Sequence, residues 1–172
     1  FITIIISMLY SSECEDYNNY NGTQYNCECN ENTWQSYYNS SNHNMEGCWL
    51  KSADFDFASL ADANLQNSYL FGISINQSSL ANTNLTGSNM NNAIIIDTFC
   101  EGAIFDSINL NTNGYIYIYS SNLEGASFIG ANLKESQFNS NNLTEVDFSN
   151  AILGSSDDSF EINYSDEYMD NI

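Results

Sequence analysis

The chain has 172 residues with 22 acidic side chains and two basic ones, which gives a formal net charge of −20. A protein this negative repels nucleic acid and anionic membranes, so direct binding to either is excluded. The acids are spread along the chain, with six before residue 52, ten in residues 53–154 and six after residue 156, so they form no catalytic cluster.

Residues 1–12 contain the strongly apolar run from Phe1 to Tyr10. The run is too short to span a bilayer, and its length is typical of the apolar core of a secretory signal peptide. The β-branched stretch from Ile2 to Ile6 equally favours a strand that pairs with a sheet edge, in the same molecule or in a neighbour. Both interpretations stand.

Residues 13–52 are rich in asparagine and tyrosine and hold four cysteines, Cys14, Cys27, Cys29 and Cys48. An even number of cysteines in a short polar segment predicts two disulfides, for which three connectivities are open. The alternative is a metal site formed by Cys27, Cys29 and His43, but Cys-x-Cys is not the usual Cys-x2-Cys spacing of zinc sites. Disulfides are therefore preferred, and no metal or cofactor is expected.

Residues 53–154 repeat every five positions. A large apolar residue recurs in nineteen units, the position two before it is usually Ala or Ser, and Asn or Asp often lies between the two. Five fits neither the helical period of 3.6 nor the strand period of 2, so the pattern indicates a solenoid in which each unit packs against its neighbours. The large residues are Phe55, Leu60, Leu65, Leu70, Ile75, Leu80, Leu85, Met90, Ile95, Cys100, Phe105 and Leu110, then Leu123, Phe128, Leu133, Phe138, Leu143, Phe148 and Leu153.

The repeated pattern Ala-(Asn/Asp)-Leu-x-x resembles that of the pentapeptide-repeat family, most clearly at Ala63-Asn64-Leu65 and Ala131-Asn132-Leu133. That family folds as an all-β, right-handed, four-sided parallel β-helix. The resemblance therefore implies a solenoid of about five coils for residues 53–154, with about four units in each coil. Asn141 at a small position and Cys100 at a large one are irregular, and Cys100 is expected to be a small core residue.

The repeat loses its phase at residues 111–120, where three residues too many separate the flanking leucines. Tyr115, Tyr117 and Tyr119 alternate with isoleucine after Asn113-Gly114, which indicates a turn followed by a strand. One interpretation is a bulged coil that absorbs the extra residues, and the other is a protruding aromatic strand used for contact.

Residues 155–172 lose the repeat and become acidic, with apolar residues interspersed. The last coil of a solenoid exposes its core and unpaired backbone, so this tail is expected to be a cap.

The residue before each large position is expected to face outward, and it is usually Asn, Asp or Ser. Ile94, Phe99 and Ile104 are apolar at this position in three consecutive units, so they and the tyrosines at 115, 117 and 119 are candidates for an interaction patch. The alternative is that the N-terminal segment of the same chain covers them.

Six Asn-x-Ser/Thr sequons are candidate glycosylation sites. Together with the paired cysteines they favour a secreted glycoprotein. The candidates are Asn21, Asn39, Asn76, Asn84, Asn142 and Asn163.

No nucleophile motif or phosphate-binding loop is present and the chain has one histidine, so no enzymatic activity is expected. The sequence predicts a non-catalytic structural or interaction scaffold outside the cell, which binds a protein partner or itself, with self-assembly into a filament or array as one form of this function.

The alternative follows from the family resemblance. Some bacterial pentapeptide-repeat proteins resemble acidic duplex DNA and bind type II topoisomerases, and the net charge is compatible with such mimicry. Against it, the ten acids of the repeats form no regular rows in the sequence, and a disulfide-rich secreted chain does not meet a topoisomerase.

Overall fold

The structure is a computed structural model that describes residues 13–19, 22, 24–40, 42–110 and 114–154, together with the backbone of residues 162–163. The apolar segment 1–12 and most of the predicted cap at 155–172 lie outside the described residues.

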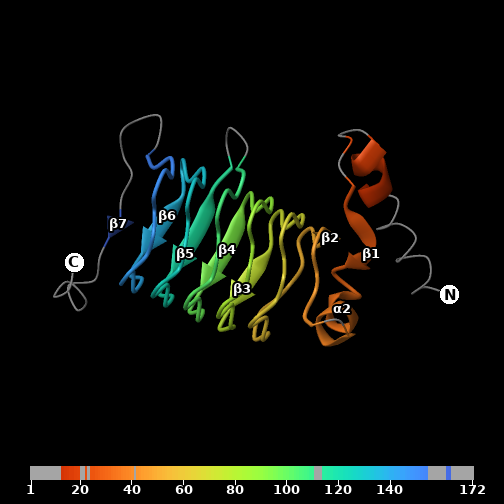
Figure 1. Cartoon of the computed structure of the whole chain (residues 1–172), viewed down its shortest axis with the longest axis horizontal. Coiled ribbons are helices and arrows are strands. Elements are labelled where there is room, and N and C mark those ends of the chain that lie inside the picture. The colour runs from red at the N-terminus through yellow and green to blue at the C-terminus, as the bar shows by residue number, and fades with distance from the viewer. Residues whose placement is uncertain are drawn as a thin grey trace.

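The repeats stack into a parallel β-solenoid of about six turns (Figure 1). Residues twenty positions apart lie side by side on neighbouring coils, as Ser59 does with Ser79. Four five-residue units therefore complete one coil, and each unit forms one wall. The predicted β-helix is confirmed, but it has about six turns instead of five. Pairing begins at Asn44, which bridges Asn64 and lies two units before the predicted start at Ala53.

One wall forms a regular parallel sheet, whose strands follow one another in chain order from β3 to β7 (Figure 1). The remaining walls pair through isolated bridges. The strands are β3 (Ser74–Asn76), β4 (Ala93–Ile96), β5 (Ile116–Tyr119), β6 (Gln137–Asn139) and β7 (Ile162–Asn163).

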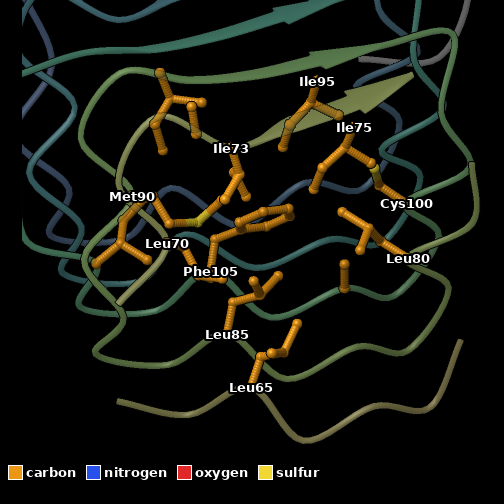
Figure 2. Close-up of a cluster of buried hydrophobic side chains, with 14 of the residues drawn as sticks. Leu65, Leu70, Ile73, Ile75, Leu80, Leu85, Met90, Ile95, Cys100 and Phe105 are labelled. Atoms are coloured by element: carbon orange, nitrogen blue, oxygen red, sulfur yellow. The ribbon is translucent and has the colours of Figure 1, made fainter. Parts of the chain in front are cut away.

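The core is built from the large residue of each unit. Figure 2 shows Ile75, Leu80 and Leu85 pointing into the same interior, with Phe105 at the centre of the view, and all four are buried. The aromatic rings continue across coils, since those of Phe105 and Phe128 stack with their centroids 4.6 Å apart. Burying side chains of this size contributes roughly 1.5–3 kcal/mol each, so the repeat is itself the main source of stability.

Polar residues at the small positions join consecutive coils. The hydroxyl groups of Ser78 and Thr83 donate hydrogen bonds, each of 2.7 Å, to the carbonyls of Phe55 and Leu60. Each of these acceptors belongs to the large residue 23 positions earlier. A serine or threonine at this slot therefore fits the corner as well as alanine does, and it adds one inter-coil bond.

Tight corners follow the large residues, and several require a left-handed backbone. Gly87 has φ of 70°, and a Cβ atom at this position would lie 2.8 Å from Oδ1 of Asn67 on the preceding coil. Asn67 itself has φ of 56°. Asparagine and glycine are the residues that adopt this conformation most readily, which explains why they recur between the apolar positions.

The phase slip does not push its strand out of the sheet. Ile95 pairs with Ile118, 23 residues later, whereas Ile75 pairs with Ile95, 20 residues later. Ile116 and Ile118 of β5 are buried, so the aromatic strand lies in the wall and the extra residues precede it. This arrangement favours the bulged coil over the protruding strand. Residues 111–113 lie outside the described part of the chain.

The region before the repeats covers the first coil. It contains a short helix over residues 13–19, β1 (Asn26–Asn30) and α2 (Trp34–Ser40), and β1 pairs in parallel with β2 (Cys48–Trp49) of the first coil. The ring of Trp34 packs edge-on against Phe55 at 5.0 Å, and the Tyr38 hydroxyl donates to the Ala61 carbonyl at 3.1 Å. Helix α2 thus closes the N-terminal end of the core.

The structure joins the four cysteines of this region in two pairs. Cys14 is bonded to Cys27, and Cys29 is bonded to Cys48. The first pair links the helix at 13–19 to β1, and the second links β1 to β2. Together they tie the region before the repeats to the first coil.

Candidate interaction face

The outward side chains of β4 and β5 form an apolar and aromatic surface, here called the Ile–Tyr face: Ile94, Ile96, Tyr117 and Tyr119. The strand register places Ile94 beside Tyr117 and Ile96 beside Tyr119. The two tyrosine rings are nearly parallel, with centroids 6.2 Å apart and an interplanar angle of 5°. Ile94 and Tyr119 are each 39% exposed. The face is therefore a contiguous platform on a wall held by sheet hydrogen bonds.

The surface changes its chemistry along the solenoid axis from one coil to the next. Asp54 bridges Ser74, Ser74 pairs with Ile94, and Tyr117 pairs with Gln137. The outward residues in this row thus change along the axis from acidic (Asp54) to hydroxyl (Ser74), aliphatic (Ile94), aromatic (Tyr117) and amide (Gln137) side chains. Asp56 shares the acidic end, where its Oδ1 accepts a hydrogen bond of 2.9 Å from the Ser74 hydroxyl.

Charged residues also flank the long edges of the Ile–Tyr face. Asp97 directly follows Ile96 and is exposed, and its backbone N–H donates to the Tyr119 carbonyl at 3.0 Å. Glu135 and Lys134 are exposed at the corner that leads into β6. The platform is thus bordered by carboxylates at one end and on both edges, with one lysine among them.

The candidate patch residues do not form one surface. Ile94, Phe99 and Ile104 lie on three successive walls of the same coil, because each five-residue step turns the chain by one wall. Phe99 bridges Ser79 and is 61% exposed, and Ile104 bridges Asn84 on the next wall.

The structure brings together Ile94, Tyr117 and Tyr119, and it adds Ile96. Sequence reasoning missed Ile96 because it follows a large residue instead of preceding it. The alternation Ile94-Ile95-Ile96 was the available signal, since alternate residues of a strand share a face. Tyr115 is exposed and lies just before β5, where its carbonyl accepts from the Asn92 N–H at 2.8 Å.

A second aromatic pair on the outer wall is covered by the chain itself. The rings of Trp49 and Tyr69 stack at 4.1 Å, and Tyr17 from the helix at 13–19 packs against both, at 5.1 and 4.9 Å. Burial, followed by the neighbouring Tyr17 and Tyr25, raises the pKa of Tyr69. The described N-terminal region thus covers Tyr69, while Ile94 and Phe99 remain exposed.

A family model of pentapeptide repeats matches eight copies in this chain, at residues 44–77, 73–111 and 120–157. These segments make up more than half of the sequence. The chain belongs to the pentapeptide-repeat family. The first matched residue is Asn44, where the first inter-coil bridge of the structure also begins.

Solved structures of other pentapeptide-repeat proteins are similar to this chain at low identity. Rfr23 from the cyanobacterium Cyanothece 51142 is 15% identical over 77% of this chain and 97% of its own, with a TM-score of 0.43. QnrB1, a plasmid-mediated fluoroquinolone resistance protein, is 16% identical over 69% of this chain and 74% of its own, also with a TM-score of 0.43. A protein of the Arabidopsis thaliana thylakoid lumen is 20% identical over 58% of this chain and 63% of its own, with a TM-score of 0.30. A comparison with curated proteins finds no significant match.

The sequons of this pentapeptide-repeat chain differ in accessibility. Asn39 is exposed at the end of α2, whereas Asn76, Asn84 and Asn142 are half-buried. Oδ1 of Asn84 and of Asn142 accepts a 2.7 Å bond from the threonine hydroxyl two residues later, so these side chains also shape the corners. Asn21 lies outside the described residues and only the backbone of Asn163 is described. Glycosylation stays a prediction at all six sites.

The described residues contain no group of three or more His, Cys, Asp or Glu side chains placed to hold a metal ion. His43 instead stacks on Tyr38 with ring centroids 4.1 Å apart. Within the same residues, no helix has the length and hydropathy needed to cross a membrane. Cys100 is buried in the core, and burial raises the pKa of its thiol, so it is unsuited to act as a nucleophile.

Proposed function

We propose that this pentapeptide-repeat protein is a non-catalytic interaction scaffold that works outside the cell, and that the Ile–Tyr face binds its protein partner. The observation that carries the proposal is the face itself, where four apolar or aromatic side chains point outward in register on one wall. Many outward positions elsewhere are polar, as at Asn64 and Ser79, and the exposed Phe99 has Ser79 and Asn122 beside it on the neighbouring coils. Contiguous exposed apolar surface of this kind is typical of binding sites.

The extracellular part of the proposal is supported by the cysteines. Two disulfides lie within residues 14–48 and fasten the N-terminal region to the first coil. Disulfides persist in oxidising compartments and are rare in the cytosol. The six sequons point the same way, since glycosylation of such sites takes place in secreted proteins.

The distribution of acids does not favour the topoisomerase hypothesis. Asp54 and Asp56 lie on the sheet wall, whereas Asp147 bridges Ser127 on a different wall. Glu101 and Glu124 occupy a corner, where Glu101 accepts from the Asn122 side chain. A duplex mimic needs rows of charge at regular spacing, and these positions do not supply them.

Filament formation by end-to-end stacking is not favoured either. Helix α2 and the Cys29–Cys48 disulfide cover the N-terminal end of the core, with Trp34 packed on Phe55. A second molecule would have to displace this cover before its last coil could pair with the first coil here. Self-association, if it is part of the function, is therefore expected through a side wall.

Two measurements test the proposal. Intact mass spectrometry of the protein from its native source, with and without reduction and glycosidase, is expected to show two disulfides and attached sugar. Free thiols at all four cysteines in a bare chain would overturn the extracellular assignment.

The second measurement replaces Ile94 with a photo-reactive phenylalanine analogue and irradiates the protein in its native extracellular material. We expect cross-links to protein from position 94. The matched control carries the same analogue at Ile104, on another wall of the same coil. Equal cross-linking from both positions would remove the Ile–Tyr face as the binding surface.

A further inference from the structure

The partner can be defined more closely, on the basis of the proposed function. We infer that the Ile–Tyr face binds a short cationic segment of polypeptide, in which a lysine or arginine lies about three residues from a pair of apolar side chains. Charge, spacing and size each lead to this inference.

The charges around the Ile–Tyr face select the sign of the partner. Asp54 and Asp56 lie at one end of the platform, and Asp97 and Glu135 lie on its edges. Two lysines are near this surface: Lys134, next to Glu135, and Lys51, three residues before Asp54, which forms an ion pair with Glu13. The whole chain carries a net charge of −20. Such a field attracts basic segments and repels acidic ones, and it increases the rate of encounter as well as the affinity.

The register fixes the distance between the acidic and apolar parts of the platform. Asp54 bridges Ser74, and Ser74 pairs with Ile94, so two inter-strand steps separate the carboxylate from the isoleucine. Two steps of about 4.8 Å amount to about 10 Å, which an extended peptide covers in about three residues. A peptide that runs along the solenoid axis therefore meets Asp54 with a residue about three positions away from the one that meets Ile94.

The size and charge of the platform favour a narrow segment over a second copy of this chain. The row from Asp54 to Gln137 contains five positions and spans roughly 20 Å, and the strands are about 10 Å wide at this wall. The resulting area of roughly 200 Å² is well below the ~800 Å² per partner of a stable protein interface. Two chains of charge −20 also repel each other, whereas a narrow basic segment fits both the area and the charge.

The test uses the full chain with its disulfides intact and three fluorescent peptides of roughly eight residues, a length that spans the platform in an extended conformation. The first peptide carries a lysine three residues before a Leu-x-Leu pair. The second has glutamate in place of the lysine, and the third has the same composition as the first with the lysine next to the leucines. Fluorescence anisotropy is expected to show binding of the first, weaker binding of the third and none of the second.

Variants of the protein locate the site. Replacing Ile94 and Tyr117 together by asparagine is expected to weaken binding of the first peptide at least about tenfold, because the apolar contact is lost. The pair Asp54→Asn and Asp56→Asn keeps a hydrogen-bond acceptor for Ser74, and it should weaken binding severalfold and reduce its dependence on salt. The matched control is Ile104→Asn, a half-buried isoleucine on another wall of the same coil, for which affinity should stay within about twofold. Far-UV circular dichroism of each variant verifies the fold.

The outcomes separate the partner from the proposed function. Equal binding of the lysine and glutamate peptides at the Ile–Tyr face would overturn the cationic partner and leave an interaction scaffold in place. If Ile104→Asn weakens binding of the first peptide as much as the double variant does, the Ile–Tyr face is not the binding site. If no peptide binds, the cationic partner is wrong, and cross-links from position 94 then decide whether the proposed function also fails.

Discussion

Replacement of Asn141 by alanine tests how the corner after the Ile–Tyr face is held. Asn141 is 5% exposed at a position that is usually Ala or Ser. Its Oδ1 accepts a hydrogen bond of 2.8 Å from the Ser121 N–H, and its Nδ2 donates one of 2.9 Å to the Ile118 carbonyl. This side chain thus ties the following coil to both ends of the segment that carries Tyr119.

The magnitude follows from these two bonds. Alanine would leave the Ser121 N–H without this acceptor in a buried corner, which costs roughly 1–3 kcal/mol, and would remove a bond to Ile118 worth about 1 kcal/mol. The expected loss is roughly 2–4 kcal/mol. Asn141→Ser is the matched control, because one coil earlier the Ser121 hydroxyl accepts from the Thr98 N–H at 3.2 Å. A serine at 141 can make the equivalent bond, so its loss should stay below about 1 kcal/mol.

Urea unfolding of the oxidised protein, followed by far-UV circular dichroism, measures both losses as changes in the free energy of unfolding. If the alanine and serine variants agree within about 0.5 kcal/mol, polar groups at the small positions do not stabilise the corners. Asn141 would then be tolerated at this small position without contributing to the stability of the fold.

Three further predictions concern the N-terminal cover, the core thiol and the aromatic pair. Trp34→Ala removes the ring that packs on Phe55 and should cost roughly 3–5 kcal/mol in urea unfolding, whereas a loss below about 1 kcal/mol would show that α2 does not cap the core. Cys100 is buried and its thiol pKa is raised, so Ellman's reagent should modify it only after unfolding, and rapid reaction of the native protein would contradict this. Burial and Tyr17 raise the pKa of Tyr69 above its usual 10.0, so the folded state keeps the proton where the unfolded state loses it. The stabilising contribution is complete below about pH 10 and is lost as the pH rises above it, so above about pH 10 stability should fall less in Tyr69→Phe than in the parent chain.

The sequence predicts the solenoid because a five-residue period is a local property that each unit repeats. It places the start of the repeats too late. The two earlier units have His43 and Cys48 at their small positions, where the later units have alanine or serine. A small residue is not needed there, because His43 stacks on Tyr38 of α2 and Cys48 bonds to Cys29 of β1.

The residues of the Ile–Tyr face can be predicted from the sequence only in part, for a different reason. A step of five residues moves to the next wall, so apolar residues in consecutive units, such as Ile94 and Phe99, point in different directions. Residues on one wall are separated by a whole coil, which is 20 residues in the regular part and 23 across the slip. The neighbour of Ile94 is thus Tyr117, and finding it requires knowing that the extra residues precede β5. The sequence alone leaves that position open.

The covered aromatic pair indicates what a partner on the Ile–Tyr face would resemble. At Trp49 and Tyr69 the chain supplies its own cover, in which Tyr17 packs on the rings and Glu13 forms an ion pair with Lys51 at the rim of the first coil. An apolar centre with one charge pair at its edge is therefore a combination that this solenoid already uses on an outer wall. At the Ile–Tyr face most of the charged residues at the rim are carboxylates, Asp54, Asp56, Asp97 and Glu135, with Lys134 beside them. A segment that binds there in the same way must carry apolar side chains for the centre and a positive charge for the rim.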